Sequence, residues 1–182
     1  MKLAISALLC FLSTSGLAQN SALFKEVEAV YFDARALYLD LHQSPELSFH
    51  ETQTAAKLAA RLRILGYDVT EHVGETGIVA ILNNGAGPTV MLRTELDALP
   101  VQEKTGLSYA SKIHAKDNSG RDVAVMHACG HDIHMASLIG AATIMAGSKG
   151  TWHGTLMLIG QPGEETISGA KRMVEDGFLI SE

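Results

Sequence analysis

The sequence predicts an α/β fold, in which a layered sheet is flanked by helices. Near the N-terminus, two segments with apolar residues at helical spacing precede three short apolar runs that are typical of strands. Another helical segment and a fully apolar run follow, and such an arrangement is typical of layered α/β domains. With 182 residues, 47% of them hydrophobic and 19% charged, the chain has the length and composition of one globular domain.

The first 18 residues have the pattern of a secretory signal peptide. Lys2 supplies the positive charge, residues 3–12 are apolar, and the small residues Gly16 and Ala18 flank an expected cleavage site after Ala18. The apolar run is short for a membrane span, and an uncleaved anchor or a buried helix is the alternative. We therefore expect a secreted or periplasmic mature chain, residues 19–182, without a membrane anchor. The net charge of −6 without a basic block excludes nucleic acid as an expected partner.

The two N-terminal helices are expected over residues 22–41 and 51–65. Apolar residues recur at helical spacing in both segments, and Pro45 interrupts the pattern between them. Gly66 is expected just past the second helix, where a glycine often takes a left-handed conformation.

Three short strands are expected next, at residues 67–73, 77–82 and 89–92. Apolar and β-branched residues dominate these runs, and residues 83–88 form a turn rich in glycine and asparagine. Residues 104–122 are polar, and we expect a loop or short hairpin there that covers the functional site.

The last elements are a helix, a strand and another helix. Asp132 is expected as the N-cap of a helix that runs to about Met145. Residues 155–159 form a fully apolar run and predict a strand. Residues 166–177 have a helical pattern with inward apolar positions.

Residues 126–134 hold one thiol, three imidazoles and one carboxylate. These groups cost free energy when buried without partners, and Cys and His are ligands for transition metals. Cys129 and His131 are two residues apart and would share one face of an extended backbone, while Gly130 lets the backbone approach a metal closely. The segment therefore predicts a metal site. The alternative is a cysteine and several histidines that serve as core filler and helix caps.

The other histidines are weaker candidates. His134 is expected in the first turn of the helix rather than as a ligand. His127 is expected either to support the site or to pack as a neutral side chain. Five further histidines have no metal-ligand spacing and are treated as background: His42, His50, His72, His114 and His153.

Two acidic pairs follow predicted strands, where ligand sites of α/β sheets lie. Glu95 and Asp97 would share one face if the strand before them continues. Glu164 and Glu165 are adjacent, so on an extended chain one could bind a metal while the other faces substrate. The alternatives are ordinary solvated acids for the first pair and a helix start for the second, where acids favour the helix dipole.

Four segments together, in this order and spacing, resemble the M20 metallopeptidase family: residues 44–48, 93–100, 126–134 and 161–170. The chain is most similar to the branch of amidohydrolases that cleave N-acyl amino acids, which includes hippurate and auxin-conjugate hydrolases. The His-Ala-Cys-Gly-His-Asp segment is the most specific part of the resemblance.

The resemblance implies roles for five residues. Cys129, His131 and Glu165 match family metal ligands, Glu164 matches the general base, and Asp97 matches a catalytic-site acid that supports the metals. It also implies a zinc-peptidase-like catalytic domain with two divalent ions, zinc or manganese. The implied activity is hydrolysis of N-acyl amino acids or small peptides by metal-activated water.

The chain departs from the family pattern in composition and in length. Glu95 replaces the usual Asp, and Gly160 and Gly163 replace the usual Phe and Ala. Family members continue beyond the position of Glu182 with further His ligands and a lid or dimerisation domain. We therefore expect residues 19–182 to be the N-terminal part of the catalytic domain, and we expect a homodimer for the intact protein. The alternative function is a non-catalytic metal-binding or interaction fragment.

Overall fold

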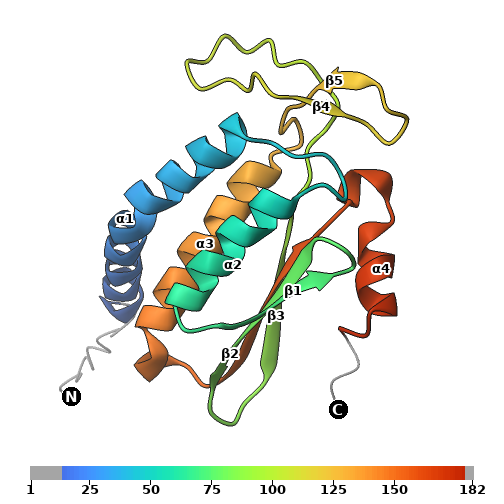
Figure 1. Ribbon diagram of the computed structural model, residues 1–182. Coiled ribbons are helices and arrows are strands. Elements are labelled where there is room, and N and C mark those ends of the chain that lie inside the picture. Colours follow the sequence, from blue (N-terminus) through green and yellow to red (C-terminus); the bar gives the residue numbers. More distant parts are fainter. Residues whose placement is uncertain (1–13, 179–182) are drawn as a thin grey trace, which may run out of the picture.

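The computed structural model describes residues 14–178, and for residues 14–22 it describes only the helical backbone. These residues form a sheet with helices on both faces (Figure 1), which confirms the α/β fold class. The helical elements are α1 (Thr14–Gln43), α2 (Thr52–Ile64), α3 (His131–Gly147), η1 (Lys149–Thr151), η2 (Glu164–Thr166) and α4 (Gly169–Glu175). The strands are β1 (Asp68–Val73), β2 (Gly77–Asn84), β3 (Thr89–Glu95), β4 (His114–Lys116), β5 (Asp122–Ala124) and β6 (Gly154–Gln161).

The predicted signal peptide falls largely outside the described residues. Residues 1–13 are not described, and α1 begins at Thr14, before the expected cleavage site after Ala18. Cleavage and export therefore stay predictions. Within residues 14–178, none of the helices combines the length and the apolar character that a membrane span requires.

The main sheet has the strand order β1-β2-β6-β3. Strand β2 pairs antiparallel with β1 and with β6, whereas β3 and β6 are parallel. In the parallel pair Glu95 is aligned with Gln161, so the carboxyl ends of β3 and β6 lie side by side. This register brings the two acidic segments of the sequence to the same edge of the sheet.

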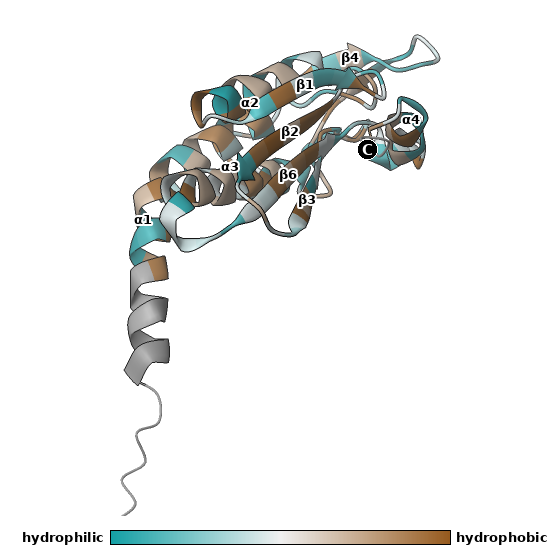
Figure 2. Cartoon of the chain, turned by 90° about the horizontal axis from the view of Figure 1, so that it is seen from below, coloured by the Kyte–Doolittle hydropathy of each residue, from teal (hydrophilic) through white to brown (hydrophobic). Residues whose placement is uncertain are grey.

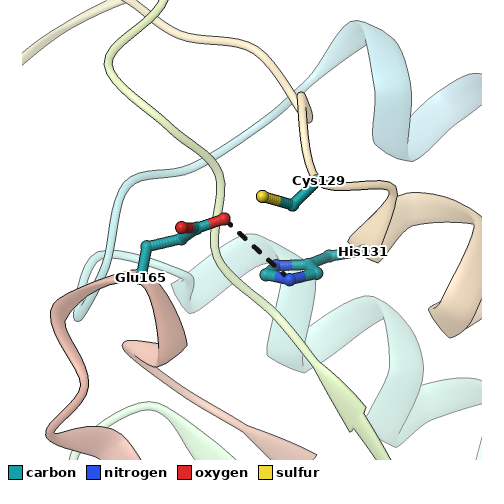
Figure 3. Close-up of side chains that lie close together, drawn as sticks. All are labelled: Cys129, His131 and Glu165. Carbon is teal, nitrogen blue, oxygen red and sulfur yellow. Dashed lines mark ion pairs between the residues drawn. The ribbon is translucent and has the colours of Figure 1, made fainter.

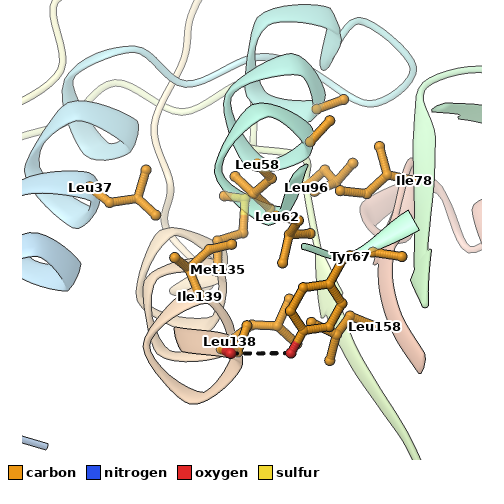
Figure 4. Close-up of a cluster of buried hydrophobic side chains, with 14 of the residues drawn as sticks. Leu37, Leu58, Leu62, Tyr67, Ile78, Leu96, Met135, Leu138, Ile139 and Leu158 are labelled. Carbon is orange, nitrogen blue, oxygen red and sulfur yellow. Dashed lines mark hydrogen bonds between the residues drawn. The ribbon is translucent and has the colours of Figure 1, made fainter. Parts of the chain in front are cut away.

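The core lies mainly between the sheet and helices α1, α2 and α3 (Figures 1 and 4). Alternate residues of β2 point to opposite faces: Ile78 belongs to this main cluster, whereas Val79 packs with Met173 of α4. Figure 4 shows Tyr67 within the main cluster, where its hydroxyl donates a hydrogen bond to the Ala142 carbonyl at 3.2 Å. Helix α3 thus packs in this core and is tied by a hydrogen bond to Tyr67, the residue before β1.

Strand β3 lies at one edge of the main sheet (Figure 2). Its apolar residues Val90 and Met91 are 53% and 52% exposed. Strands β4 and β5 form a separate antiparallel pair, which confirms the predicted short hairpin. The hairpin packs through a small buried cluster of Leu47, Ala98 and Val125.

Candidate metal centre

Three predicted metal ligands converge in the structure. One potential ligand atom from each of Cys129, His131 and Glu165 lies within 4.8 Å of the others (Figure 3). Cys129 lies in the loop before α3, His131 is the first residue of α3, and Glu165 belongs to η2 just after β6. The fold therefore brings together ligands that are up to 36 residues apart, from Cys129 to Glu165.

The backbone at Gly130 sets the direction of His131. Gly130 is the N-cap of α3 and has a left-handed conformation with φ of 81°, which glycine adopts without a Cβ clash. The prediction that Asp132 is the N-cap is wrong, because this turn at Gly130 starts the helix at His131. Asp132 lies inside the first turn and its carboxylate is used elsewhere.

His131 is buried and its two ring nitrogens face different partners. Nδ1 lies 2.8 Å from the carbonyl oxygen of Asp97, which only accepts hydrogen bonds, so Nδ1 carries the proton. Nε2 lies 3.7 Å from a carboxylate oxygen of Glu164 and 4.0 Å from one of Glu165. The neutral tautomer thus directs its lone pair toward the two glutamates, which is the usual arrangement of a metal-binding histidine.

Asp97 joins the segments that carry the ligands. Its side chain is fully buried, and Oδ2 accepts hydrogen bonds from the Ser48 hydroxyl at 2.6 Å and from the Glu165 backbone N–H at 2.9 Å. Oδ1 lies 3.5 Å from Nδ1 of His131. Asp97 therefore contacts both the His131 ring and the turn that presents Glu165.

Strand β3 ends at Glu95, so the condition under which Glu95 and Asp97 would share a face is not met. Glu95 instead pairs with His134 at 2.9 Å and with Arg93 at 2.8 Å. His134 lies in the first turn of α3, as expected, and does not belong to the three-residue ligand cluster.

The acidic surroundings keep His131 and Cys129 protonated when no cation is present. Burial lowers the pKa of His131, but the nearby Asp97 carboxylate and the hydrogen bond to the Asp97 carbonyl outweigh it and raise that pKa to about 9. The hydrogen bond to Glu165, burial and the nearby carboxylates raise the pKa of Cys129 to about 11. The positive charge of a metal would replace these protons.

The donor set fits a divalent metal. Within the part of the chain that the structure describes, two buried oxygens, Asp97 Oδ1 and Glu165 Oε1, have no hydrogen-bond partner. Buried polar atoms without a partner are rare and need an explanation. A cation bound beside Glu165 would explain the unpaired Glu165 Oε1. Sulfur, nitrogen and oxygen donors in one cluster are typical ligands of zinc.

Glu164 lies next to the ligands but faces solvent more than Glu165 does. Its side chain is 40% exposed, against 17% for Glu165. A cavity of about 280 Å³ opens beside Glu165. The hairpin residues Asp117 and Asn118 line it together with apolar side chains, including Leu99, so the predicted hairpin does reach the site.

Sequence reasoning missed two buried residues that surround the centre. His42, treated as background, lies 2.6 Å from Asp132 and 3.2 Å from Glu103. Glu51 is fully buried and accepts a hydrogen bond from the Gly163 N–H at 2.8 Å. Neither residue has a local motif, because the partners are 90 and 112 residues away along the chain.

His127 is a buried, neutral side chain, one of its two expected roles. Burial lowers its pKa to about 4. Within the described residues neither of its ring nitrogens has a hydrogen-bond partner.

Comparison with known proteins gives one family. A model described as peptidase family M20/M25/M40 matches residues 91–182. The chain is 46% identical over 140 residues to hippurate hydrolase of Campylobacter jejuni. This match covers 76% of this chain and 34% of that protein. It is 41% identical over 140 residues to N-acetyl-L-cysteine deacetylase of Bacillus subtilis, with 76% and 32% covered. The chain thus spans about a third of the length of these curated relatives.

Solved structures agree with this match. The Bacillus subtilis protein YxeP, described as a dinuclear metal-binding peptidase of the M20 family, superposes with a TM-score of 0.74 at 35% sequence identity. The superposition covers 84% of this chain and 41% of that one.

Proposed function

Because the chain belongs to the M20/M25/M40 peptidase family, we propose that it carries catalytic residues of a metal-dependent amide hydrolase. The proposed substrates are N-acyl amino acids or small peptides, since the similar proteins are named for hippurate and for N-acetylcysteine. The observation that carries the proposal is the convergence of Cys129, His131 and Glu165 beside Glu164.

In this proposal Cys129, His131 and Glu165 hold a divalent cation. When bound, such a cation polarises the scissile carbonyl and lowers the pKa of an attacking water. A thiolate ligand favours zinc over manganese, which prefers oxygen ligands. Support for a second cation comes from the relative described as dinuclear.

Glu164 is the proposed general base. Its exposed carboxylate, close to the ring of His131, can accept the proton of the attacking water and pass it to the leaving amine. Asp97 has a supporting role, because it contacts the His131 ring and the Glu165 backbone N–H. The apolar cavity beside Glu165 suits an apolar acyl group or side chain of a small substrate.

A second candidate function is metal binding without catalysis. Among the described residues the cluster offers three potential ligands, whereas two metal ions need more donors between them. The chain also spans about a third of the length of its curated relatives.

The test combines zinc titration with hydrolysis of hippurate and N-acetyl amino acids. Glu164→Gln should bind zinc as the unchanged chain does and should lose about 10²–10⁴-fold in turnover, the usual contribution of a general base. Cys129→Ala should lose zinc binding. The control is Glu175→Gln, which alters an exposed acid of α4 and should change neither property.

Two outcomes separate the candidates. Hydrolysis by Glu164→Gln at the normal rate would show that Glu164 is not the base. Zinc binding without any hydrolysis by the unchanged chain would favour the metal-binding function.

A further inference from the structure

We propose that His42 is a positioning residue for the metal centre and acts through Asp132 at the start of α3. The inference rests on the proposed function, because it assigns a role relative to the ligand His131. It concerns residues outside the ligand cluster, and it explains a buried charged group that the mechanism above does not use.

His42 lies at the C-terminal end of α1 and bridges two carboxylates. Nδ1 lies 2.6 Å from Asp132 Oδ2, and Nε2 lies 3.2 Å from Glu103 Oε1. The three side chains are almost fully enclosed, with exposed fractions of 6% for His42, 2% for Asp132 and 0% for Glu103. An imidazole that donates from both nitrogens is protonated, so the cluster is a buried cation between two anions.

The pKa of His42 agrees with this geometry. Burial lowers the pKa, but the hydrogen bonds to Asp132 and Glu103 outweigh it and raise the pKa above its ordinary value. The rings of Tyr38 and Tyr109 pack around the imidazole, with centroids 5.6 Å and 5.4 Å away. These rings limit the access of water to the cluster.

The cluster fixes the residue next to a metal ligand. Asp132 directly follows His131, and the N-cap Gly130 has no side chain with which to fix this turn. Asp132 Oδ1 also accepts a hydrogen bond from the Ile133 N–H at 2.9 Å. With one oxygen held by His42 and the other by its own turn, Asp132 sets the backbone that carries the His131 ring.

The His42 imidazole also connects the loop around Glu103, which precedes the hairpin, to Asp132 of α3. Glu103 accepts hydrogen bonds from the Ser111 N–H and from the Thr105 hydroxyl, and it also contacts His42. Helix α1, the first turn of α3 and the loop around Glu103 therefore meet at one side chain.

Stability alone does not account for such a cluster. Buried ion pairs are often no more stabilising than apolar residues of the same volume, because each charge loses its hydration. A buried ionic cluster does define one geometry, since displacement of any member leaves a charge unpaired. A cluster with one defined geometry is suited to hold the backbone of His131, because the direction of a ligand's side chain affects metal affinity.

The experiment uses His42→Gln, Asp132→Asn and the double variant, each titrated with zinc. Each single change should weaken zinc binding about 10-fold, at the lower end of the range for residues that orient metal ligands. The double variant should lose no more than either single variant, because both break the same link. Tyr67→Phe is the control: it removes a buried hydrogen bond to Ala142, at the other end of α3.

A purely structural role predicts a different pattern. In that case zinc affinity would fall with the midpoint of thermal unfolding in every variant, including Tyr67→Phe. That pattern, or unchanged affinity in His42→Gln, would overturn the inference. If His42→Gln does not fold, the triple variant His42→Gln, Asp132→Asn and Glu103→Gln removes all three charges and should show the same 10-fold loss.

A metal-free measurement separates this inference from the proposed function. Amide hydrogen exchange at residues 133–136 should be faster in His42→Gln than in Tyr67→Phe when both are compared with the unchanged chain. If the unchanged chain binds no zinc, the proposed metal function fails, and the exchange data alone decide the role of His42. Equal exchange in the two variants would refute that role.

Discussion

Replacement of Glu51 by Leu should destabilise the fold strongly, although Glu51 touches neither a ligand nor the proposed base. Glu51 is fully buried, and its carboxylate accepts hydrogen bonds from the Gly163 N–H and the Thr76 hydroxyl. Leu would leave both donors buried and unpaired. Each such group costs about 1–3 kcal/mol, so the expected loss in free energy of unfolding is about 2–6 kcal/mol.

Urea denaturation, followed by the fluorescence of the single tryptophan Trp152, measures this loss. Glu51→Gln is the matched variant. Its carbonyl can accept from Gly163 and its amide can donate to the Thr76 oxygen, so its loss should be about 1 kcal/mol or less. Adding Thr76→Val to Glu51→Leu should recover about 1–3 kcal/mol, because one unpaired donor is removed.

The pH dependence gives a second check on Glu51. Burial raises the pKa of Glu51 despite its hydrogen bonds. The folded chain therefore keeps this proton at a pH where the unfolded chain has lost it, and stability should fall as pH rises from the ordinary glutamate range through the raised value. Glu51→Gln should lack this decrease. A loss below about 1 kcal/mol in Glu51→Leu would refute the assigned hydrogen-bond role.

Three further predictions concern the centre and its surroundings. The unfolded chain protonates His127 near its ordinary pKa of about 6.5, but the folded chain does so only near pH 4. Stability in urea should therefore fall as pH decreases between these values, and His127→Leu should reduce this slope. Zinc should displace the protons of Cys129 and His131, so its affinity should rise with pH, roughly tenfold per pH unit for each proton displaced. Both protons count below pH about 9, and the proton of Cys129 alone counts from there to pH about 11. Below pH about 9, calorimetry in buffers of different ionisation enthalpy should count about two protons, and release of none would contradict the assignment. Gly163→Ala should lower the free energy of unfolding by about 1–3 kcal/mol because of the left-handed backbone at this position. The loss should be larger still, because the new Cβ would lie 2.4 Å from the Phe49 ring. Gly85→Ala is the control in the same urea assay, since Gly85 has a φ of +87° and no neighbour within 4 Å of an added Cβ.

The sequence predicts the metal-ligand residues where they lie close together along the chain or directly after a recognisable strand. Cys129 and His131 stand in one short segment, and Glu165 follows a strand whose apolar character is plain from the sequence. The family resemblance then supplied the pairing of these segments. Their catalytic and metal-binding roles stay predictions until the variants above are measured.

Other features depend on contacts that no local pattern encodes. The partner of His42 is 90 residues away, so the histidine alone gave no sign of its role. The predicted start of α3 lies two residues too late, because Asp132 is a good N-cap by residue type, whereas the observed N-cap is Gly130 with its left-handed backbone. Likewise Glu95 and Asp97 obey strand alternation only while the strand lasts, and β3 ends at Glu95.

The central place of β6 has a consequence for synthesis on the ribosome. Strands β2 and β3 emerge early but are both neighbours of β6 and not of each other, so neither can complete its pairing until β6 is made. In the nascent chain Cys129 and His131 emerge before Glu165, and the register that aligns Glu95 with Gln161 forms only after β6 inserts. Translation order therefore places assembly of the proposed cation site after β6 has paired with its two neighbours in the sheet.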